Sequence, residues 1–159
     1  MVLPPTPTRT DTPLGQGWVA GGARWARIKA LLLDQCVLRG MGNIYTDESL
    51  WRARIHPTRL GATLTREELR RLYRTVRRVL THAIQLRGSS VSDYLDAEGR
   101  RGEFQKLHRV YQREGEKCFR CGAIVGRAIV AGRGTYYCPR CQRAPRVRRR
   151  VNHRKRLPR

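Results

Sequence analysis

Two pairs of cysteines constrain this chain more than any other feature of its sequence. Cys118-x-x-Cys121 is followed, after sixteen residues, by Cys138-x-x-Cys141. Each pair can offer two thiolates to one metal ion, and a chain reversal between the pairs brings all four into a tetrahedron. The spacing is typical of a structural zinc site. We expect one Zn2+ here, bound by four thiolates that leave no position for a reactive water.

The segment between the two cysteine pairs predicts a β-hairpin. Apolar residues flank Gly126 (Ile124, Ile129 and Val130), and Tyr136-Tyr137 leads into the second pair. The glycines of Gly132-Arg133-Gly134 favour a tight turn, and this places Arg133 at the predicted tip.

Disulfide bonds and a redox-active pair are the alternatives to zinc. No basic segment followed by a long apolar run marks a secretory signal, which disfavours disulfides. A redox motif needs one cysteine pair ahead of a helix, whereas this chain has two pairs around a predicted hairpin. The remaining cysteine, Cys36, has apolar neighbours and is expected to be a core or turn thiol.

Helical signals precede the cysteines. The apolar pattern from Trp25 to Gln35 predicts a short buried helix, and the glycines that follow predict a turn. Asn43 is a favoured N-cap for a second helix over 44–54, which His56-Pro57 would end. Thr65-x-x-Glu68 forms a capping box for a longer helix with one apolar stripe. Arginines occupy its other faces, either as a solvated surface or as phosphate contacts.

These signals predict a mainly α fold with a small β zinc hairpin. We expect a helical domain over 24–110, with a loop near 88–104, and the zinc hairpin over 111–142. Residues 1–23 are rich in Pro, Thr and Gly, and residues 143–159 form a basic tail. Both ends are expected to be linker or disordered segments, because they cannot bury enough apolar surface to offset their ordering entropy.

The charge of the chain indicates a polyanionic partner. Lys and Arg number 34 against 12 Asp and Glu, which gives a net charge of +22. Nine of the basic residues lie in 143–159, so the rest of the chain keeps +13 (22 − 9). Charge does not distinguish DNA from RNA or an anionic membrane, because the attraction is Coulombic. No apolar run exceeds four residues (Ala30-Leu31-Leu32-Leu33 is one), so none can span a bilayer, and we expect a cytoplasmic protein.

Several motifs in order resemble a known family. They are Leu32-Leu33-Asp34-Gln35, Gly40-Met41-Gly42-Asn43-Ile44-Tyr45-Thr46-Asp47-Glu48, Arg54-Ile55-His56-Pro57, Gly88-Ser89-Ser90 and the segment from Gly132 to Gln142. From about Ile28 to Gln142 the chain resembles the C-terminal part of formamidopyrimidine-DNA glycosylases. That part is a helix–two-turns–helix domain followed by a zinc finger. The endonuclease VIII branch is a close alternative, but the Gly-Ser-Ser loop and the zinc hairpin are more similar to the formamidopyrimidine branch.

The resemblance implies a partner and a set of contacts. The partner is damaged double-stranded DNA with oxidised purines (formamidopyrimidine or 8-oxoguanine), bound by a monomer. The DNA-binding residues it implies are Gly40, Gly42, Asn43, Tyr111 and Arg133, and the lesion loop contains Ser89, Ser90 and Tyr94. Such a loop closes over an everted base. From the residues alone, an N-cap is the favoured role of Asn43 and a solvated turn residue that of Arg133, and Tyr111 could also be a packed aromatic.

Catalysis in the resembled family belongs to an N-terminal proline, followed by glutamate, in a β-sandwich domain. This chain starts Met1-Val2-Leu3-Pro4, and the Pro4 nitrogen is a tertiary amide that cannot form an imine. We therefore expect no catalytic residue in this chain, and a separate N-terminal catalytic half is a candidate partner. Three hypotheses follow: the DNA-binding portion of a base-excision glycosylase and AP lyase, an active enzyme with an unrecognised amine, or a zinc-ribbon RNA-binding or ribosome-associated protein.

Overall fold

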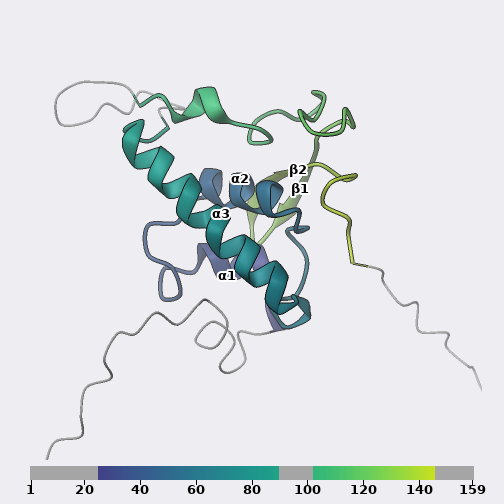
Figure 1. Ribbon diagram of the computed structural model, residues 1–159. Coiled ribbons are helices and arrows are strands. Elements are labelled where there is room, and N and C mark those ends of the chain that lie inside the picture. Colours follow the sequence, from purple (N-terminus) through teal and green to yellow (C-terminus); the bar gives the residue numbers. More distant parts are fainter. Residues whose placement is uncertain (1–24, 90–101, 146–159) are drawn as a thin grey trace, which may run out of the picture.

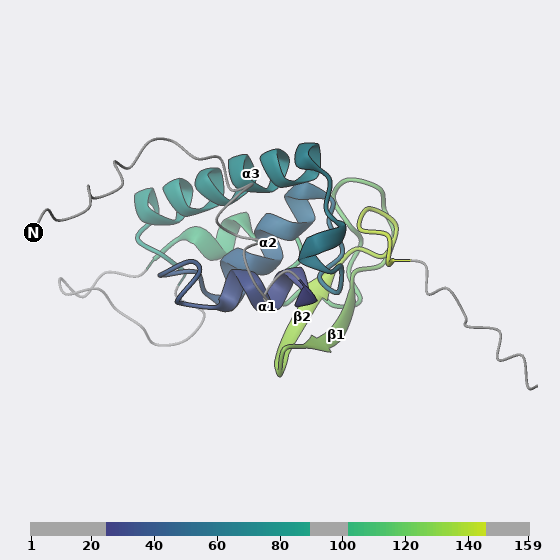
Figure 2. The same cartoon turned by 90° about the horizontal axis from the view of Figure 1, so that it is seen from below.

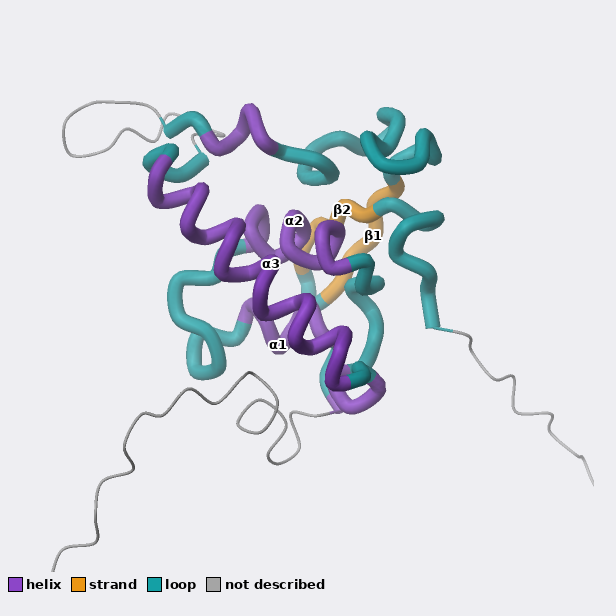
Figure 3. Tube along the Cα trace, viewed as in Figure 1, coloured by secondary structure: helices purple, strands orange, loops and turns teal. Residues whose placement is uncertain are grey.

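The computed structural model describes residues 25–89 and 102–145 (Figure 1). These residues form α1 (Ile28–Leu33), α2 (Asn43–Ala53), the 3-10 helix η2 (Gly61–Thr63), α3 (Arg66–Gln85), the 3-10 helix η3 (Phe104–Leu107), β1 (Gly126–Val130) and β2 (Arg133–Tyr137). The expected mainly α fold with a small zinc hairpin is confirmed (Figure 3). The expectations for 1–23, for Ser90 and Tyr94, and for most of the basic tail lie outside the described residues.

The starts of two helices test the capping predictions. At α3, Thr65 Oγ1 accepts the Glu68 N–H at 3.1 Å and Glu68 Oε2 accepts the Thr65 N–H at 2.9 Å, so the capping box is confirmed. At α2 the N-cap is Gly42, and Asn43 is the first helical residue. The prediction of Asn43 as N-cap was therefore wrong by one position.

The ends of the first two helices also differ from the sequence prediction. α1 covers six residues, fewer than the Trp25–Gln35 pattern suggested. α2 ends at Ala53, because Arg54 adopts a left-handed conformation (φ 59°) and its N–H bonds back to Leu50 and Trp51. The helix thus stops ahead of Pro57. Cys36 lies exposed in the turn after α1, so its prediction as a turn thiol holds and its prediction as a core thiol does not.

α2 is the central element of the fold. It packs against α3 on one side and against α1 and β2 on the other (Figure 2). One hydrophobic core joins the three helices and includes Ile28, Leu32, Leu50, Ile55 and Leu72. A second core, around Trp51, Val110 and Val125, encloses two of the cysteines. No helix in 25–89 or 102–145 is long and apolar enough to cross a membrane.

The hairpin turns through two residues. β1 and β2 pair antiparallel, with Val130 opposite Arg133, so Ala131 and Gly132 form the turn. Both have positive φ, 52° and 69°, which matches the right-handed twist of the flanking strands. Arg133 is consequently the first residue of β2 and lies beside the turn, one position from the tip expected for it.

Candidate zinc centre and nucleic-acid interface

The four predicted zinc ligands converge. The sulfur atoms of Cys118, Cys121, Cys138 and Cys141 all lie within 4.8 Å of one another. The Cys121–Cys138 sulfurs are 3.4 Å apart and the Cys118–Cys141 sulfurs 4.0 Å apart. A tetrahedral site with Zn–S bonds of ~2.3 Å has sulfurs about 3.8 Å apart, so the cluster fits this ion. The chain carries a four-cysteine structural zinc site, as the spacing predicted.

N–H donors surround two of the ligand sulfurs. Trp51 Nε1–H donates to Cys118 Sγ at 3.4 Å, and the Cys141 backbone N–H donates to Cys138 Sγ at 3.4 Å. Burial raises the pKa of Cys118, but hydrogen bonds from Arg120, Trp51, Cys121 and Cys138 together lower this pKa to about 6. The surroundings of Cys118 therefore favour the thiolate that binds a metal.

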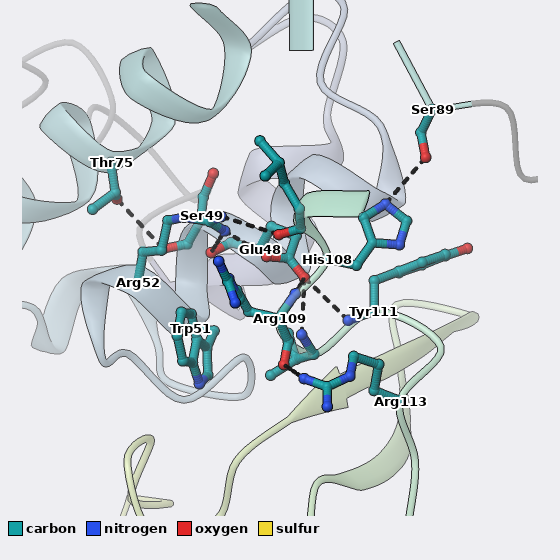
Figure 4. A network of polar contacts seen from close by, with 12 residues as sticks. Glu48, Ser49, Trp51, Arg52, Thr75, Ser89, His108, Arg109, Tyr111 and Arg113 are labelled. Atoms are coloured by element: carbon teal, nitrogen blue, oxygen red, sulfur yellow. Dashed lines mark hydrogen bonds and ion pairs between the residues drawn. The ribbon is translucent and has the colours of Figure 1, made fainter. Parts of the chain in front are cut away.

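Glu48 joins the zinc module to the helices. Its Oε1 accepts three backbone N–H groups, from Arg109 at 2.7 Å, Val110 at 2.9 Å and Tyr111 at 3.1 Å (Figure 4). The other oxygen, Oε2, pairs with Arg52. The Glu48 side chain is fully buried. This one carboxylate therefore satisfies the backbone N–H donors of a turn that has no secondary structure of its own.

Asp47, the preceding residue, fixes the hairpin to α1 and α2. Its Oδ1 pairs with Lys29 Nζ at 2.7 Å, and its Oδ2 accepts the Tyr136 N–H at 2.9 Å. Burial raises the pKa of Asp47 to about 6, although the Lys29 ammonium counteracts the rise. Both side chains are completely buried. The pair therefore sets where β2 lies relative to the helices.

Gln142 forms a third link between the zinc module and the helical part of the chain. Its Oε1 accepts the Cys138 N–H at 2.9 Å and its Nε2 donates to the Ile55 carbonyl at 2.9 Å. The sequence reasoning missed Lys29, Asp47, Glu48 and Gln142 as functional positions. One signal was present: two adjacent acids in the predicted second helix of a strongly basic chain demand partners if they are buried.

The start of α2 lies against the hairpin. Asn43 Nδ2 donates to the Gly134 carbonyl at 3.0 Å, and Lys29 Nζ donates to the same oxygen at 3.1 Å. The exposed Arg133 is the neighbouring residue of β2. Gly40 has a left-handed φ of 80°, whereas Gly42 is extended. The structure thus brings Gly40, Gly42, Asn43 and Arg133 to one place.

This arrangement is chemically suited to an anion. The first N–H groups of α2 have no partner within the helix and carry the positive end of its dipole. Arg133 adds a full charge beside them and is free of described side-chain partners. Asn43 Oδ1 is buried without a hydrogen-bond partner, and one amide hydrogen is committed to Gly134. The backbone of α2, more than the Asn43 side chain, therefore offers donors.

Tyr111 and Ser89 occupy a neighbouring aromatic region. The Tyr111 ring makes edge contacts with Tyr136 at 5.2 Å and His108 at 5.4 Å between centroids. Ser89 Oγ lies 3.1 Å from His108 Nε2 (Figure 4). At the base of the predicted lesion loop, the Phe104 N–H donates to the Gly88 carbonyl at 3.0 Å. Tyr111 is thus packed beside the zinc module, and the two ends of the loop meet.

Comparison with protein families gives two matches. Residues 7–94 match the formamidopyrimidine-DNA glycosylase H2TH domain, and residues 115–144 match the zinc finger found in FPG and IleRS. The formamidopyrimidine-DNA glycosylase of Pelotomaculum thermopropionicum is 52% identical over 120 residues, which are 76% of this chain and 44% of that protein. The formamidopyrimidine-DNA glycosylase of Thermus thermophilus is 55% identical over 117 residues, which are 72% of this chain and 44% of that protein. The chain therefore spans less than half the length of these relatives.

Solved structures agree with the sequence matches. A complex between Lactococcus lactis Fpg and DNA containing an abasic site superposes with a TM-score of 0.71 at 43% identity, covering 76% of this chain and 44% of that one. The MutM (FPG) protein of Thermus thermophilus superposes with a TM-score of 0.70 at 54% identity, covering 74% of this chain and 45% of that one.

Proposed function

This chain belongs to the formamidopyrimidine-DNA glycosylase family through its helix–two-turns–helix domain and zinc finger, and on that premise we propose that it binds damaged duplex DNA. The binding surface is the start of α2 together with Arg133 of the zinc hairpin. The solved relatives include a complex with abasic-site DNA, which supports this partner. Oxidised purines, as formamidopyrimidine or 8-oxoguanine, are the lesions we propose for it.

One observation carries the proposal. The Gly134 carbonyl accepts hydrogen bonds from both Asn43 Nδ2, at the start of α2, and Lys29 Nζ of α1, so the hairpin is bound to both helices. Arg133 is thereby held next to the free N–H groups at the start of the helix. Such a pair can engage phosphates of one strand, the guanidinium by a charge-assisted fork and the helix by its dipole.

We propose that the described residues contribute binding and no covalent chemistry. A Schiff base requires an accessible, neutral amine. Of the three lysines in the described residues, Lys29 is buried in an ion pair with Asp47 and Lys106 Nζ pairs with Glu103 at 2.6 Å. The third, the exposed Lys117, adjoins the zinc ligand Cys118. Trapping with borohydride on an abasic-site duplex tests this. We expect no covalent adduct above a control with blocked amines, and efficient trapping would show a catalytic amine in this chain.

Arginine substitution tests the DNA surface. Arg133→Gln should weaken binding to a duplex with an abasic-site analogue by about tenfold or more, because a hydrogen bond to a charged group contributes roughly 1.5–3 kcal/mol. Arg140→Gln is the matched control, since Arg140 is also exposed and lies between the zinc ligands Cys138 and Cys141, away from the hairpin turn. Equal affinities of the two variants, by fluorescence anisotropy, would contradict the proposed surface.

Salt and nucleic-acid type provide a second test. If six to eight phosphates are neutralised, the log–log slope of affinity against salt should be about −5 to −7. A structured RNA bound as tightly as the abasic duplex would instead favour the RNA-binding alternative.

A further inference from the structure

The outer face of α3 carries arginines that have no role inside the protein. Arg66, Arg70, Arg74, Arg77 and Arg78 are all exposed. In the part of the chain that the structure describes, none of them forms an ion pair or a side-chain hydrogen bond; only Arg77 makes a contact, 5.6 Å from the centre of the Tyr73 ring. Arg71 differs, because its Nε donates to the Ala53 carbonyl at 2.8 Å. Folding thus uses one arginine and leaves the outer five free.

The opposite, apolar face of α3 is the one that packs against the core. Leu72, Val76, Val79 and Ala83 are buried against the rest of the domain. The two acids of α3 lie in its first turn, where Glu68 pairs with Arg59 and Glu67 approaches Arg71. Neither acid pairs with an arginine of the outer face.

The spacing of these arginines works against the helix itself. Arg66, Arg70, Arg74 and Arg78 follow one another at four-residue steps, and like charges at this spacing destabilise a helix. A face that only needed solvation would be more stable with alternating signs. The stripe formed by these four arginines therefore points to negative charge supplied by a binding partner.

The dimensions of the stripe suit a DNA backbone. Twelve residues separate Arg66 from Arg78, which corresponds to about 18 Å along the helix axis. Phosphates of one DNA strand advance about 3.4 Å each along the duplex axis, so the stripe spans roughly five of them. Arginine forks suit phosphate oxygens, and the contact requires no base recognition.

The stripe lies far from the surface assigned to the hairpin. α3 is on one side of α2, while α1 and the β-hairpin are on the other (Figures 1 and 2). One straight duplex on the hairpin side would not reach the outer face of α3. We propose that this face is a second DNA-binding surface, which holds the phosphate backbone of another duplex segment while the first surface is occupied.

Capture of two duplexes by the full chain tests the proposal. An abasic-site duplex is immobilised on beads, the protein is added, and a fluorescent undamaged duplex is offered in solution. The variant with Arg66→Gln, Arg70→Gln, Arg74→Gln and Arg78→Gln should capture at least tenfold less of the fluorescent duplex and still bind the immobilised one within about twofold. Arginine to lysine changes at the same four positions are the matched control and should keep the capture.

Separate readouts make each outcome decisive. The glutamine variant should melt at the same temperature as the parent or higher, because like-charge repulsion within α3 is removed. Undiminished capture by this variant overturns the proposal, as does loss of capture by the lysine variant. Lost binding to phosphatidylserine vesicles with unchanged DNA capture would show a membrane surface instead. If Arg133→Gln has no effect while the glutamine variant loses capture, the function proposed for the hairpin fails and the α3 surface stands.

Discussion

The indole N–H of Trp51, in α2, donates to the Cys118 sulfur over 3.4 Å, so a helix residue stabilises a zinc ligand 67 positions away. The Arg120 guanidinium lies over the same indole, 4.1 Å from the ring centre, and donates to the Trp51 carbonyl at 3.1 Å. Partners of this kind, one step removed from the metal, orient its ligands and tune its affinity.

Replacing Trp51 should therefore loosen the metal. In Trp51→Phe the ring is largely kept and the N–H···S bond is lost, so zinc affinity should fall by about tenfold, at the low end of the usual range for such partners. Transfer of zinc to a colorimetric chelator measures this. Trp25→Phe is the matched control, because Trp25 is 66% exposed and outside the zinc cluster. Equal transfer rates from both variants would show that the indole only fills space.

Metal removal is expected to affect more than the hairpin. A structural zinc contributes on the order of 10–16 kcal/mol to folding of such modules, so Cys138→Ser or chelation should unfold the module and abolish DNA binding. The helices should stay folded at room temperature but melt earlier, because Asp47, Glu48 and Gln142 lose their partners. Far-ultraviolet circular dichroism follows the helices, and elemental analysis should find one zinc per chain. Folded protein with far less zinc would contradict the structural role.

Glu48→Gln should destabilise the fold strongly. The neutral amide weakens the bonds to three backbone N–H groups and leaves Arg52 without its ion-pair partner. We expect a loss of about 2–4 kcal/mol in the free energy of unfolding, measured with urea on zinc-loaded protein. Glu67→Gln, at a side chain that is 87% exposed, should change it by less than about 0.5 kcal/mol. Similar losses in both variants would mean that the buried contacts of Glu48 contribute little.

The Lys29–Asp47 pair should behave as a unit. Lys29→Met leaves a buried carboxylate and Asp47→Asn leaves a buried ammonium, so each alone should lower stability by about 3–5 kcal/mol. The double variant should lose clearly less than the sum, because neither charge is then left unpaired. Additive losses in a double-mutant cycle would show that the two side chains act independently.

The zinc site and the main helix could be predicted from sequence because their determinants are local. Two Cys-x-x-Cys pairs specify four ligands, and the hairpin between them needs only a turn of left-handed residues. The capping box of Thr65 and Glu68 is likewise formed within four residues. The positions that join the two halves were not predictable in this way. Glu48 meets its partners 61 to 63 residues later, and Lys29 meets Gly134 after 105.

Asn43 is the clearest case in which a contact between distant segments overrides a local preference. Local preference made it an N-cap, a role for which its side chain must fold back onto its own helix. In the structure the side chain instead donates to the Gly134 carbonyl, and Gly42 takes the cap position. The position of that carbonyl depends on the buried Asp47 carboxylate, which binds both Lys29 and the Tyr136 N–H. Local patterns were enough to specify which residues bind the metal and which segments become helices, since both depend on neighbours along the chain. Only tertiary structure placed Arg133 beside the start of α2, because that placement rests on buried polar bonds between distant segments, whose partners no local pattern encodes.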